Sequence, residues 1–251
     1  MAETRWVYGY KPALEALSGS GEGVLEVLLS EGRRRGVEEI QRRARSAGAP
    51  VRLVEDRELS RLCDGGHHQG VAVRLEEFSY ADFDGALEAL SASQEAVVLV
   101  LDGVQDPMNL GAILRTAVGA GVRLVVLPKH RAAGVTPAAV RSSAGLASQV
   151  PVAQVTNLAR ALERLKEERF WVAGAAAGGG QRPWEVDLKG RLALVLGSEG
   201  RGMRRLVQES CDYLVTVPLV EGVDSLNVSV SAAMLLYEAV RQRGEGGESP
   251  G

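Results

Sequence analysis

Polar side chains able to bind or react follow three strand-like runs in the second half of the chain, VVLVLD, LALVLG and YLVTVP. They are Asn109, Gly111 and Arg115 after the first run, Gly197, Glu199, Gly200 and Gly202 at the end of the second, and Ser225, Leu226, Asn227 and Ser229 after the third. In α/β sheets, ligands bind where the strands end. Amides, a carboxylate and a guanidinium at three such ends therefore predict one composite site.

Arg115 is the residue of this set whose chemistry indicates a class of ligand. Its neighbours Ile113, Leu114 and Ala117 are apolar, and an arginine in such a helix either extends to water or binds an anion. Phosphate is the natural anion, because a guanidinium matches it bidentately. Asn109 has a plainer alternative, since asparagine is a favoured N-cap for the helix that follows.

The second and third loops each allow a structural and a ligand-binding interpretation. The glycines of GSEGRGM let backbone amides approach a ligand. The segment lacks the Gly-Lys-Ser/Thr ending of a P-loop, so a nucleotide hydrolase is a weak hypothesis. Glu199 is either a surface turn residue or part of the site. In the third loop a helix cap accounts for one polar residue. Four short polar residues at alternate positions favour a hydrogen-bonded pocket, namely Ser225, Asn227, Ser229 and Ser231.

The composition is typical of a soluble globular protein, with 251 residues, 45% of them hydrophobic and 24% charged. No stretch approaches the ~18 consecutive apolar residues of a membrane helix. The start, MAETRWVYGY, has no basic segment followed by an apolar stretch. We therefore expect a cytoplasmic protein in which Cys63 and Cys211 are reduced thiols. His67 and His68 have no further ligands at metal-binding spacing, so they indicate a surface turn or an RNA-contacting loop and no metal site.

The charge balance argues mildly against a nucleic-acid partner, because the net charge is -3 and the pI about 5.8. A local basic patch would nevertheless suffice to bind RNA. The candidate patches are Arg33-Arg34-Arg35, Arg42-Arg43-Arg45, Lys129-His130-Arg131, and Arg201 with Arg204-Arg205. Taken singly, each is more often a solvated face than a binding surface.

Strand and helix signals predict two α/β domains. The first, 1–75, has expected strands at 24–30, 51–54 and 70–75 and expected helices at 37–48 and 57–63. A linker with one short helix is expected over 76–95. The second domain, 96–243, has expected strands at 97–102, 123–128, 150–155, 170–176, 192–197 and 213–218 and expected helices at 109–120, 156–168, 203–210 and 228–243. Its continuous apolar runs suit a parallel sheet buried on both faces. The Gly/Ser/Pro-rich tail, 244–251, is expected to be disordered.

Together the three loops resemble the SpoU (TrmH-like) family of RNA ribose 2'-O-methyltransferases, within the knotted SPOUT class. The family's first motif is an Asn, a Gly and an Arg six positions after the Asn. Its second motif is Gly-x-Glu-Gly-x-Gly, and its third is Ser-Leu-Asn-x-Ser ahead of a helix. All three are met in order over about 96–243 by the residues named above. In the first domain, YGYKPALEAL and HHQGVAV are similar to the family's small substrate-binding domain.

The resemblance implies a trefoil knot in the second domain, a homodimer, and S-adenosyl-L-methionine as cofactor. By motif position, the cofactor contacts would be Gly197, Glu199, Gly202, Val217 and Leu226. A true knot is not something that a sequence pattern shows, because knots are nearly absent from folds. The resemblance also implies RNA as partner, most closely a guanosine of large-subunit ribosomal RNA.

In the reaction that the resemblance implies, Arg115 holds the RNA phosphate and organises proton removal from the ribose hydroxyl. Asn109, Glu199, Ser225 and Asn227 would position Arg115 and the ribose, and no metal is required. A transfer-RNA substrate and an adenosine target stay open. So does a different class of function, a non-catalytic RNA-binding factor in ribosome assembly.

Overall fold

The computed structural model describes residues 4–17, 23–32, 36–63, 66–76, 78–223 and 225–244. The chain forms two compact units, Met1–Ser79 with Thr136–Arg141, and Tyr80–Val135 with Ser142–Gly251. The short helix α6 (Pro137–Ser142) lies largely in the segment grouped with the first unit. Most of the tail 244–251, for which we predicted disorder, lies outside the described residues.

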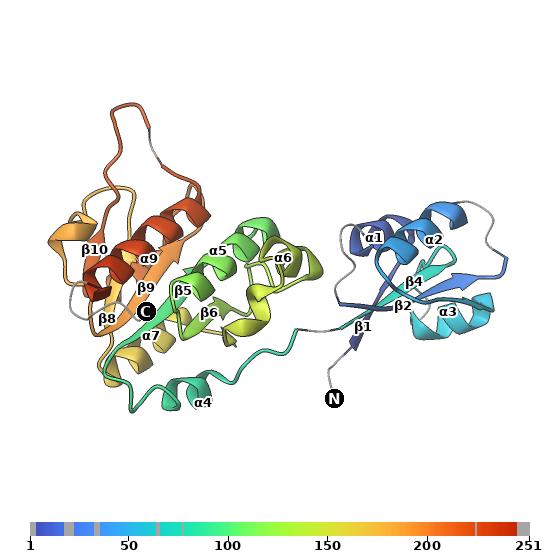
Figure 1. Ribbon diagram of the computed structural model, residues 1–251, viewed down its shortest axis with the longest axis horizontal. Helices are drawn as coiled ribbons and strands as arrows, with labels where there is room; N and C mark the ends of the chain where they lie inside the picture. The colour runs from blue at the N-terminus through green and yellow to red at the C-terminus, as the bar shows by residue number, and fades with distance from the viewer. Residues whose placement is uncertain are drawn as a thin grey trace. The chain divides into compact units, whose positions relative to one another are not determined.

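The first unit is a four-stranded mixed sheet in the order β1-β4-β2-β3, with helices on both faces (Figure 1). Its strands are β1 (Thr4–Tyr8), β2 (Val24–Ser30), β3 (Val51–Val54) and β4 (Val71–Glu76), and its helices are α1 (Tyr10–Ala16), α2 (Val37–Ser46) and α3 (Asp56–Leu62). Only β2 and β3 pair in parallel. The predicted strands are confirmed, whereas β1 and α1 were not expected. The signal of β1 is weak because it is an edge strand, paired with β4 alone.

Alternate residues of β2 serve the two faces of this sheet. Val27 and Leu29 pack with α1 and α2, and Leu28 packs with α3, as the two-residue period of a strand requires. On α2, Ile40 and Ala44 face the sheet and are buried. A run such as VLEVLLS is therefore apolar on both faces because both are covered.

His68 corrects the expectation of a surface turn in the first unit. The residue is 9% exposed, Gly70 N donates to Nδ1 at 3.1 Å, and Ser60 Oγ lies 3.0 Å from Nε2. The neighbouring Gln69 accepts a hydrogen bond from Tyr10 N at 2.9 Å. Both residues therefore fasten the turn before β4 to other parts of the unit.

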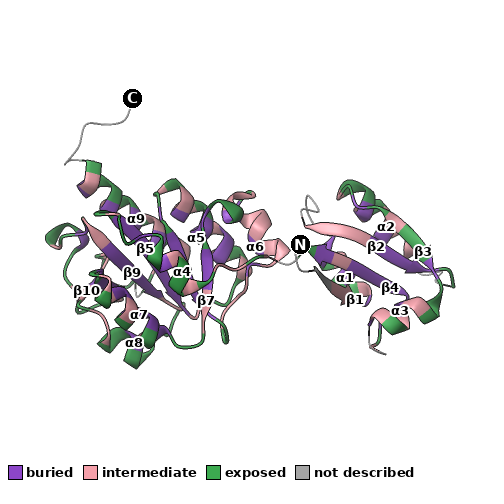
Figure 2. Ribbon diagram, turned by 90° about the horizontal axis from the view of Figure 1, so that it is seen from below, coloured by how far each residue is buried: buried purple, intermediate pink, exposed green. Residues whose placement is uncertain are grey.

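The second unit is a six-stranded, wholly parallel sheet in the order β10-β8-β9-β5-β6-β7. Its strands are β5 (Ala96–Asp102), β6 (Leu124–Pro128), β7 (Val152–Val155), β8 (Trp171–Ala175), β9 (Arg191–Gly197) and β10 (Tyr213–Val215). Its helices are α4 (Phe83–Glu88), α5 (Pro107–Gly119), α7 (Leu158–Glu167), α8 (Arg205–Glu209) and α9 (Val228–Gly244), with 3-10 turns η1 (Leu146–Gln149) and η2 (Pro183–Glu185). The predicted parallel sheet is confirmed, and its central strands β9, β5 and β6 lie buried between helices (Figure 2).

Residues 80–95, within the segment expected as a linker, pack on the second unit. Asp82 caps α4, Ala81 bridges to Ala153 of β7, and Leu87 and Leu90 join the core cluster between the sheet and α7. The helix expected in this segment is α4. Its burial gives 80–95 a structural role in the second unit.

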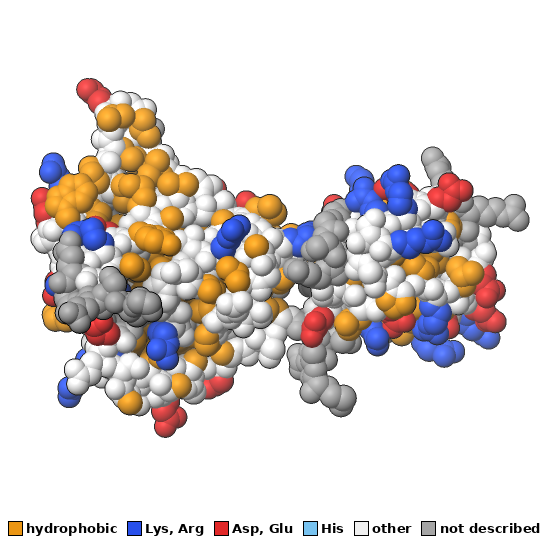
Figure 3. Space-filling model, viewed as in Figure 1, with side chains coloured by type: hydrophobic (Ala, Val, Ile, Leu, Met, Phe, Trp, Pro, Cys, Tyr) orange, Lys and Arg blue, Asp and Glu red, His pale blue; other side chains and the backbone are white. Residues whose placement is uncertain are grey.

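The chain returns from the edge of the sheet to its middle before it ends. β10 is an edge strand, yet α9 packs against α5 and β9. This return is what the knotted topology implied by the resemblance requires. α9 also carries a row of exposed apolar side chains, and hydrophobic atoms gather over it in Figure 3.

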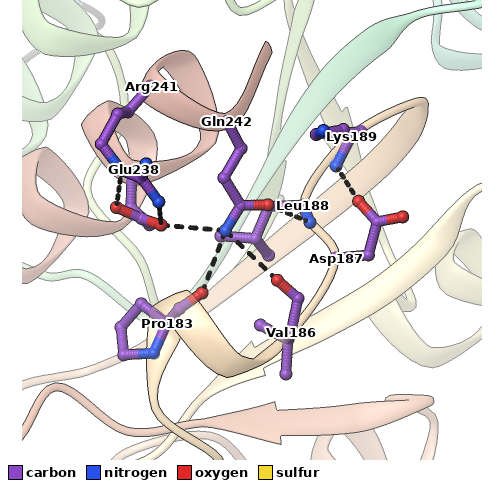
Figure 4. A network of polar contacts seen from close by, with 8 residues as sticks. All are labelled: Pro183, Val186, Asp187, Leu188, Lys189, Glu238, Arg241 and Gln242. Carbon is purple, nitrogen blue, oxygen red and sulfur yellow. Dashed lines mark hydrogen bonds and ion pairs between the residues drawn. The ribbon is translucent and has the colours of Figure 1, made fainter. Parts of the chain in front are cut away.

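Gln242 holds the last turn of α9 against the connection between β8 and β9 (Figure 4). Its Oε1 accepts from Leu188 N at 2.9 Å, and its Nε2 lies 3.2 Å from both Pro183 O and Val186 O and 2.9 Å from Glu238 Oε1. A buried glutamine thus supplies hydrogen-bond partners to backbone groups of this connection.

Among the described residues, no helix combines the length and apolarity needed to cross a membrane.

Candidate functional site

Three of the predicted site residues form a closed triangle of side-chain hydrogen bonds. Asn109 Nδ2 donates to Glu199 Oε1 at 2.8 Å. Asn227 Nδ2 donates to the same oxygen at 2.8 Å and lies 3.0 Å from Asn109 Oδ1. The triangle joins the start of α5, the loop after β9 and the start of α9. The composite site expected from three strand ends is therefore present as geometry.

Asn109 is not the cap of α5. Asp106 is the N-cap, accepting from Met108 N at 3.0 Å, and Pro107 follows at the first helical position, where proline is favoured. Asn109 therefore lies inside the first turn, and its side chain is directed to Glu199 and Asn227. A surface-turn role for Glu199 is likewise wrong, since one of its oxygens accepts from both amides and from Val228 N.

Asn227 caps α9 and so has two functions. Its Oδ1 accepts from Ser229 N at 2.8 Å and from Ser229 Oγ at 2.6 Å, as in an N-cap. With Oδ1 engaged there, Nδ2 is turned toward Glu199 and Asn109. The cap thus orients the amide that closes the triangle, and Ser229 orients the cap.

A cavity of about 530 Å³ opens next to the triangle. This volume lies within the range of ~300–1,000 Å³ usual for small-molecule sites. The predicted residues among those that line it are Gly197, Glu199, Gly200, Gly202, Val217, Ser225 and Leu226. Ser231, which was expected in a polar pocket, also lines the cavity. Sequence reasoning missed the lining by Ala175–Ala177 at the end of β8 and by Leu219 and Leu235. The position of 175–177 at the carboxyl end of a predicted strand was the signal that could have identified them.

The glycine loop after β9 is closed by its own backbone. Ser198 N donates to Gly202 O at 3.1 Å, and Gly202 N donates to Ser198 O at 2.9 Å. A Cβ on Gly197 would lie 2.0 Å from the carbonyl carbon of Gly202, so no other residue fits without moving the loop. Gly200 and Gly202 have φ of 77° and 66°, which non-glycine residues adopt only with strain.

Asp102, which sequence reasoning did not single out, fixes the far end of this loop. Its side chain is fully buried and accepts from Arg204 N and Arg204 Nε, both at 2.7 Å. Asp102 also pairs in register with Gly197 across β5 and β9. Both ends of the glycine loop are therefore tied to one residue. Arg204 and Arg205 are engaged by Asp102 and Glu209, so that candidate basic patch is largely ion-paired.

Arg115 does not join the triangle. It is exposed on α5, and its side chain makes no hydrogen bond or ion pair with any residue that the structure describes. It lies six residues after Asn109, which places it about 9 Å further along the helix and about 120° around it. It shares a face instead with Met108 and Ala112. Of the five residues predicted to be catalytic, three interact directly, Ser225 lines the cavity and Arg115 stands apart.

Comparison with known proteins assigns the chain to a family. The model of the SpoU rRNA methylase family matches residues 96–237, and the model of RNA 2'-O ribose methyltransferase substrate-binding domains matches residues 6–81. This chain belongs to the SpoU rRNA methylase family. The two matches correspond to the two compact units. The match over residues 96–237 contains every residue of the triangle and the cavity. The family expected from the three motifs is therefore confirmed.

Curated relatives and solved structures of this family cover nearly the whole chain. A 23S rRNA (guanosine-2'-O-)-methyltransferase RlmB of Xanthomonas campestris is 42% identical over 96% of this chain and 98% of its own length. A putative TrmH family tRNA/rRNA methyltransferase of Staphylococcus aureus is 40% identical, over 91% and 93%. A putative RNA methyltransferase of the TrmH family from Porphyromonas gingivalis superposes with a TM-score of 0.59 at 27% identity, over 95% and 90%. The SpoU methyltransferase AviRb from Streptomyces viridochromogenes, in complex with AdoMet, shares the fold with a TM-score of 0.63 at 24% identity, over 97% and 92%.

Proposed function

We propose that this protein transfers a methyl group from S-adenosyl-L-methionine to the ribose 2'-oxygen of a guanosine in 23S rRNA. The observation that carries the proposal is the triangle of Asn109, Glu199 and Asn227 at the edge of a cavity lined by motif residues. The similarity to guanosine-2'-O-methyltransferases along both units supports the choice of substrate. A cytoplasmic location, where ribosomal RNA is modified, follows from that substrate.

The cavity fits the cofactor in volume and chemistry. Gly197 and Gly202 leave backbone exposed to a bound molecule, and Val217 and Leu226 offer apolar surface to an adenine ring. Ser225 and Glu199 supply polar groups on the same lining. Bound there, S-adenosyl-L-methionine would supply a methyl group activated by its positively charged sulfur. We therefore assign cofactor binding to Gly197, Glu199, Gly202, Val217 and Leu226.

The reaction balances as a displacement at the methyl carbon. The ribose 2'-oxygen forms a bond to that carbon, the carbon–sulfur bond breaks with its electron pair left on sulfur, and the hydroxyl proton passes to water. Asn109, Asn227 and Glu199 hold one another rigidly, and Ser225 lies beside them on the cavity wall. Such positioning can contribute ~7–11 kcal/mol to a reaction that needs in-line attack. Arg115 would bind the phosphate beside the target ribose and assist loss of the proton.

A homodimer accounts for the isolation of Arg115. Met108, Met234 and Tyr237 are 55%, 47% and 55% exposed, and they lie on α5 and α9, which pack side by side. Arg115 lies one and two helical turns from Ala112 and Met108 on the same face. A second copy of the chain seated on the face formed by Met108, Met234 and Tyr237 would bury these side chains and would bring Arg115 toward the partner. The apolar area and the unpartnered arginine thus support one arrangement.

The dimer is tested by substituting a charge on the apolar face. We expect Met234→Glu to give a monomer by light scattering and to lose methyl transfer, because a carboxylate would be buried in the interface. Leu206→Glu is the matched control, since Leu206 is 60% exposed on α8, away from this face. A dimeric, active Met234→Glu variant would contradict the arrangement.

Methyl transfer itself is tested with labelled S-adenosyl-L-methionine and two RNA pools, unmodified 23S rRNA and bulk tRNA. Label at one guanosine of 23S rRNA, mapped as a 2'-O-methyl group, is the expected result. Label in tRNA alone would keep the reaction and replace the substrate. Absence of label in either pool, with cofactor binding intact, would favour a non-catalytic RNA-binding factor.

The role of Arg115 is tested by Arg115→Ala. We expect loss of turnover with nearly unchanged affinity for S-adenosylhomocysteine, because Arg115 does not line the cavity. Arg115→Lys should recover little activity, since lysine cannot make the bidentate phosphate contact. Weakened cofactor binding in a folded Arg115→Ala variant would contradict this division of roles.

A further inference from the structure

The segment Lys129-His130-Arg131 lies at the same edge of the second unit's sheet as the site. It follows β6 at once, and β6 is the neighbour of β5 in the wholly parallel sheet. The carboxyl ends of β5, β6 and β9 therefore meet at one edge, where the cavity also opens. All three side chains are exposed.

Backbone contacts hold this segment beside the glycine loop. A Cβ on Gly103, just after β5, would lie 3.8 Å from Arg131 O and 3.8 Å from Ser198 Cβ. Ser198 lines the cavity. Lys129 N donates to Val155 O and Ala133 N donates to Val104 O, both at 2.8 Å. Hydrogen bonds thus fix the basic segment to the ends of β5 and β7, and Gly103 lies close both to this segment and to Ser198 of the cavity wall.

The charges of this segment are available to a ligand. Neither Lys129 nor Arg131 makes an ion pair or side-chain hydrogen bond with any residue in the described part of the chain. By contrast, Arg204 in the neighbouring loop is neutralised by Asp102. A chain of net charge -3 needs a local concentration of cations to attract an RNA backbone. Lys129 and Arg131 provide two, next to the place where a ribose must be held.

We propose that Lys129 and Arg131 form a phosphate-binding rim of the active site, which holds the RNA backbone adjacent to the methylated nucleotide. This inference rests on the proposed function. The rim supplies affinity and register, because phosphate contacts position a nucleic acid without reading its sequence. The chemical step itself stays with the triangle and Arg115.

The chain offers a control matched in residue type, exposure and backbone. Arg169 is exposed and has φ of 63°, like Arg131 with φ of 58°. Lys189 is exposed like Lys129, and neither control residue forms an ion pair within the described residues. Arg169 and Lys189 precede β8 and β9, so they lie at the opposite, amino edge of the parallel sheet. The two pairs differ in position and share the same charge.

The experiment compares Lys129→Gln/Arg131→Gly with Lys189→Gln/Arg169→Gly in the full-length protein. Glycine accepts a positive φ, so both arginine replacements are compatible with folding, which thermal unfolding checks. Binding of an unmodified 23S rRNA transcript is measured at several KCl concentrations, together with methyl transfer and S-adenosylhomocysteine affinity. Both variants lose two positive charges, so any general effect of net charge is common to them.

We expect the rim variant to bind RNA on the order of 10- to 100-fold more weakly, the loss of two charge-assisted contacts. Its salt dependence, the slope of log K against log[KCl], should fall by about 1.4 if each contact releases ~0.7 counterion. The rim variant should bind S-adenosylhomocysteine as tightly as wild type. The control variant should match wild type in RNA binding, in its salt dependence and in S-adenosylhomocysteine affinity. Weakened S-adenosylhomocysteine binding would assign the rim to the cofactor and overturn the proposal.

Equal RNA binding by the rim variant and wild type would also overturn the rim and leave the proposed function intact, provided wild type methylates the transcript. Equal weakening in both variants would show a general charge effect and overturn the rim. A wild-type protein that transfers no methyl group but still depends on the rim for RNA binding would refute the proposed function alone. Absence of RNA binding by wild type would refute both.

Discussion

Replacing Gln242 by methionine is expected to destabilise the second unit by about 3 kcal/mol. Methionine has similar length but neither donates nor accepts strongly. The change would leave Leu188 N, whose residue is 1% exposed, without a partner, and Pro183 O, whose residue is buried, without its side-chain donor. Each orphaned backbone group costs ~1–3 kcal/mol. Val186 is half-buried and regains water, and Glu238 keeps Arg241, so these two contacts add little.

The assay is urea unfolding of the full chain, followed by circular dichroism and tryptophan fluorescence. Trp184 lies in η2, within the segment that Gln242 holds, whereas Trp6 belongs to the first unit and reports the other transition. A loss of about 3 kcal/mol corresponds to a fall in melting temperature of roughly 6–12 °C for a unit of this size. Gln208→Met on the exposed surface of α8 is the control, with an expected change within about 0.5 kcal/mol.

Gln242→Glu adds a pH arm to this test. Its carboxylate would face Pro183 O and Glu238, which are acceptors, so its loss of stability should be largest at neutral pH and smaller once the carboxyl is protonated. A Gln242→Met variant no less stable than Gln208→Met would refute the reasoning, because the orphaned backbone groups would then carry no cost.

Three further results are expected. Gly197→Ala should weaken S-adenosylhomocysteine binding at least about tenfold by calorimetry, because its Cβ would overlap Gly202; wild-type affinity would contradict this. Burial raises the pKa of the Cys211 thiol to about 11, so its alkylation at pH 8, followed by mass spectrometry, should be far slower than that of free cysteine. The hydrogen bond from Arg241 lowers the pKa of Glu238. The stability that the Glu238–Arg241 pair gives to the folded protein should be fully present above the pKa of an unfolded glutamate, about 4.3, and lost as pH falls through the lower pKa of Glu238 in the folded protein. The stability gap to Glu238→Gln in urea unfolding should therefore close in acid, and a gap unchanged at low pH would count against it.

Much of the second unit was predictable because buried parallel strands have a strong local signal. The run VVLVLD is apolar at nearly every position because both faces of β5 are covered. The polar residues after such runs had to share one edge, since carboxyl ends of parallel strands coincide. The family motifs then identified which of those residues belong together, and the structure brings Asn109, Glu199 and Asn227 into contact.

Other features lack a local signal. The edge strand β1 pairs on one side alone, and His68 is buried by neighbours that its own segment does not specify. In the sequence, Asp102 is only the last residue of an apolar run. It holds the glycine loop through its hydrogen bonds from Arg204, which lies 102 residues away. The N-cap of α5 is Asp106, and the side chain of Asn109 binds a residue outside its helix, which its own segment does not specify.

The sequence by itself determined where all the strands but β1 lie, which residues follow them, and to which family the motifs belong, because periodicity, turn residues and spacing are local properties. The tertiary structure alone decided which groups meet. Asn109 contacts residues 90 and 118 positions away because β9 pairs with β5 and α9 returns to pack on α5. That Arg115 points away from Asn109, by contrast, follows from their six-residue spacing along α5. Strand order and the return of the chain are set by the packing of the whole unit, and no segment read alone contains them.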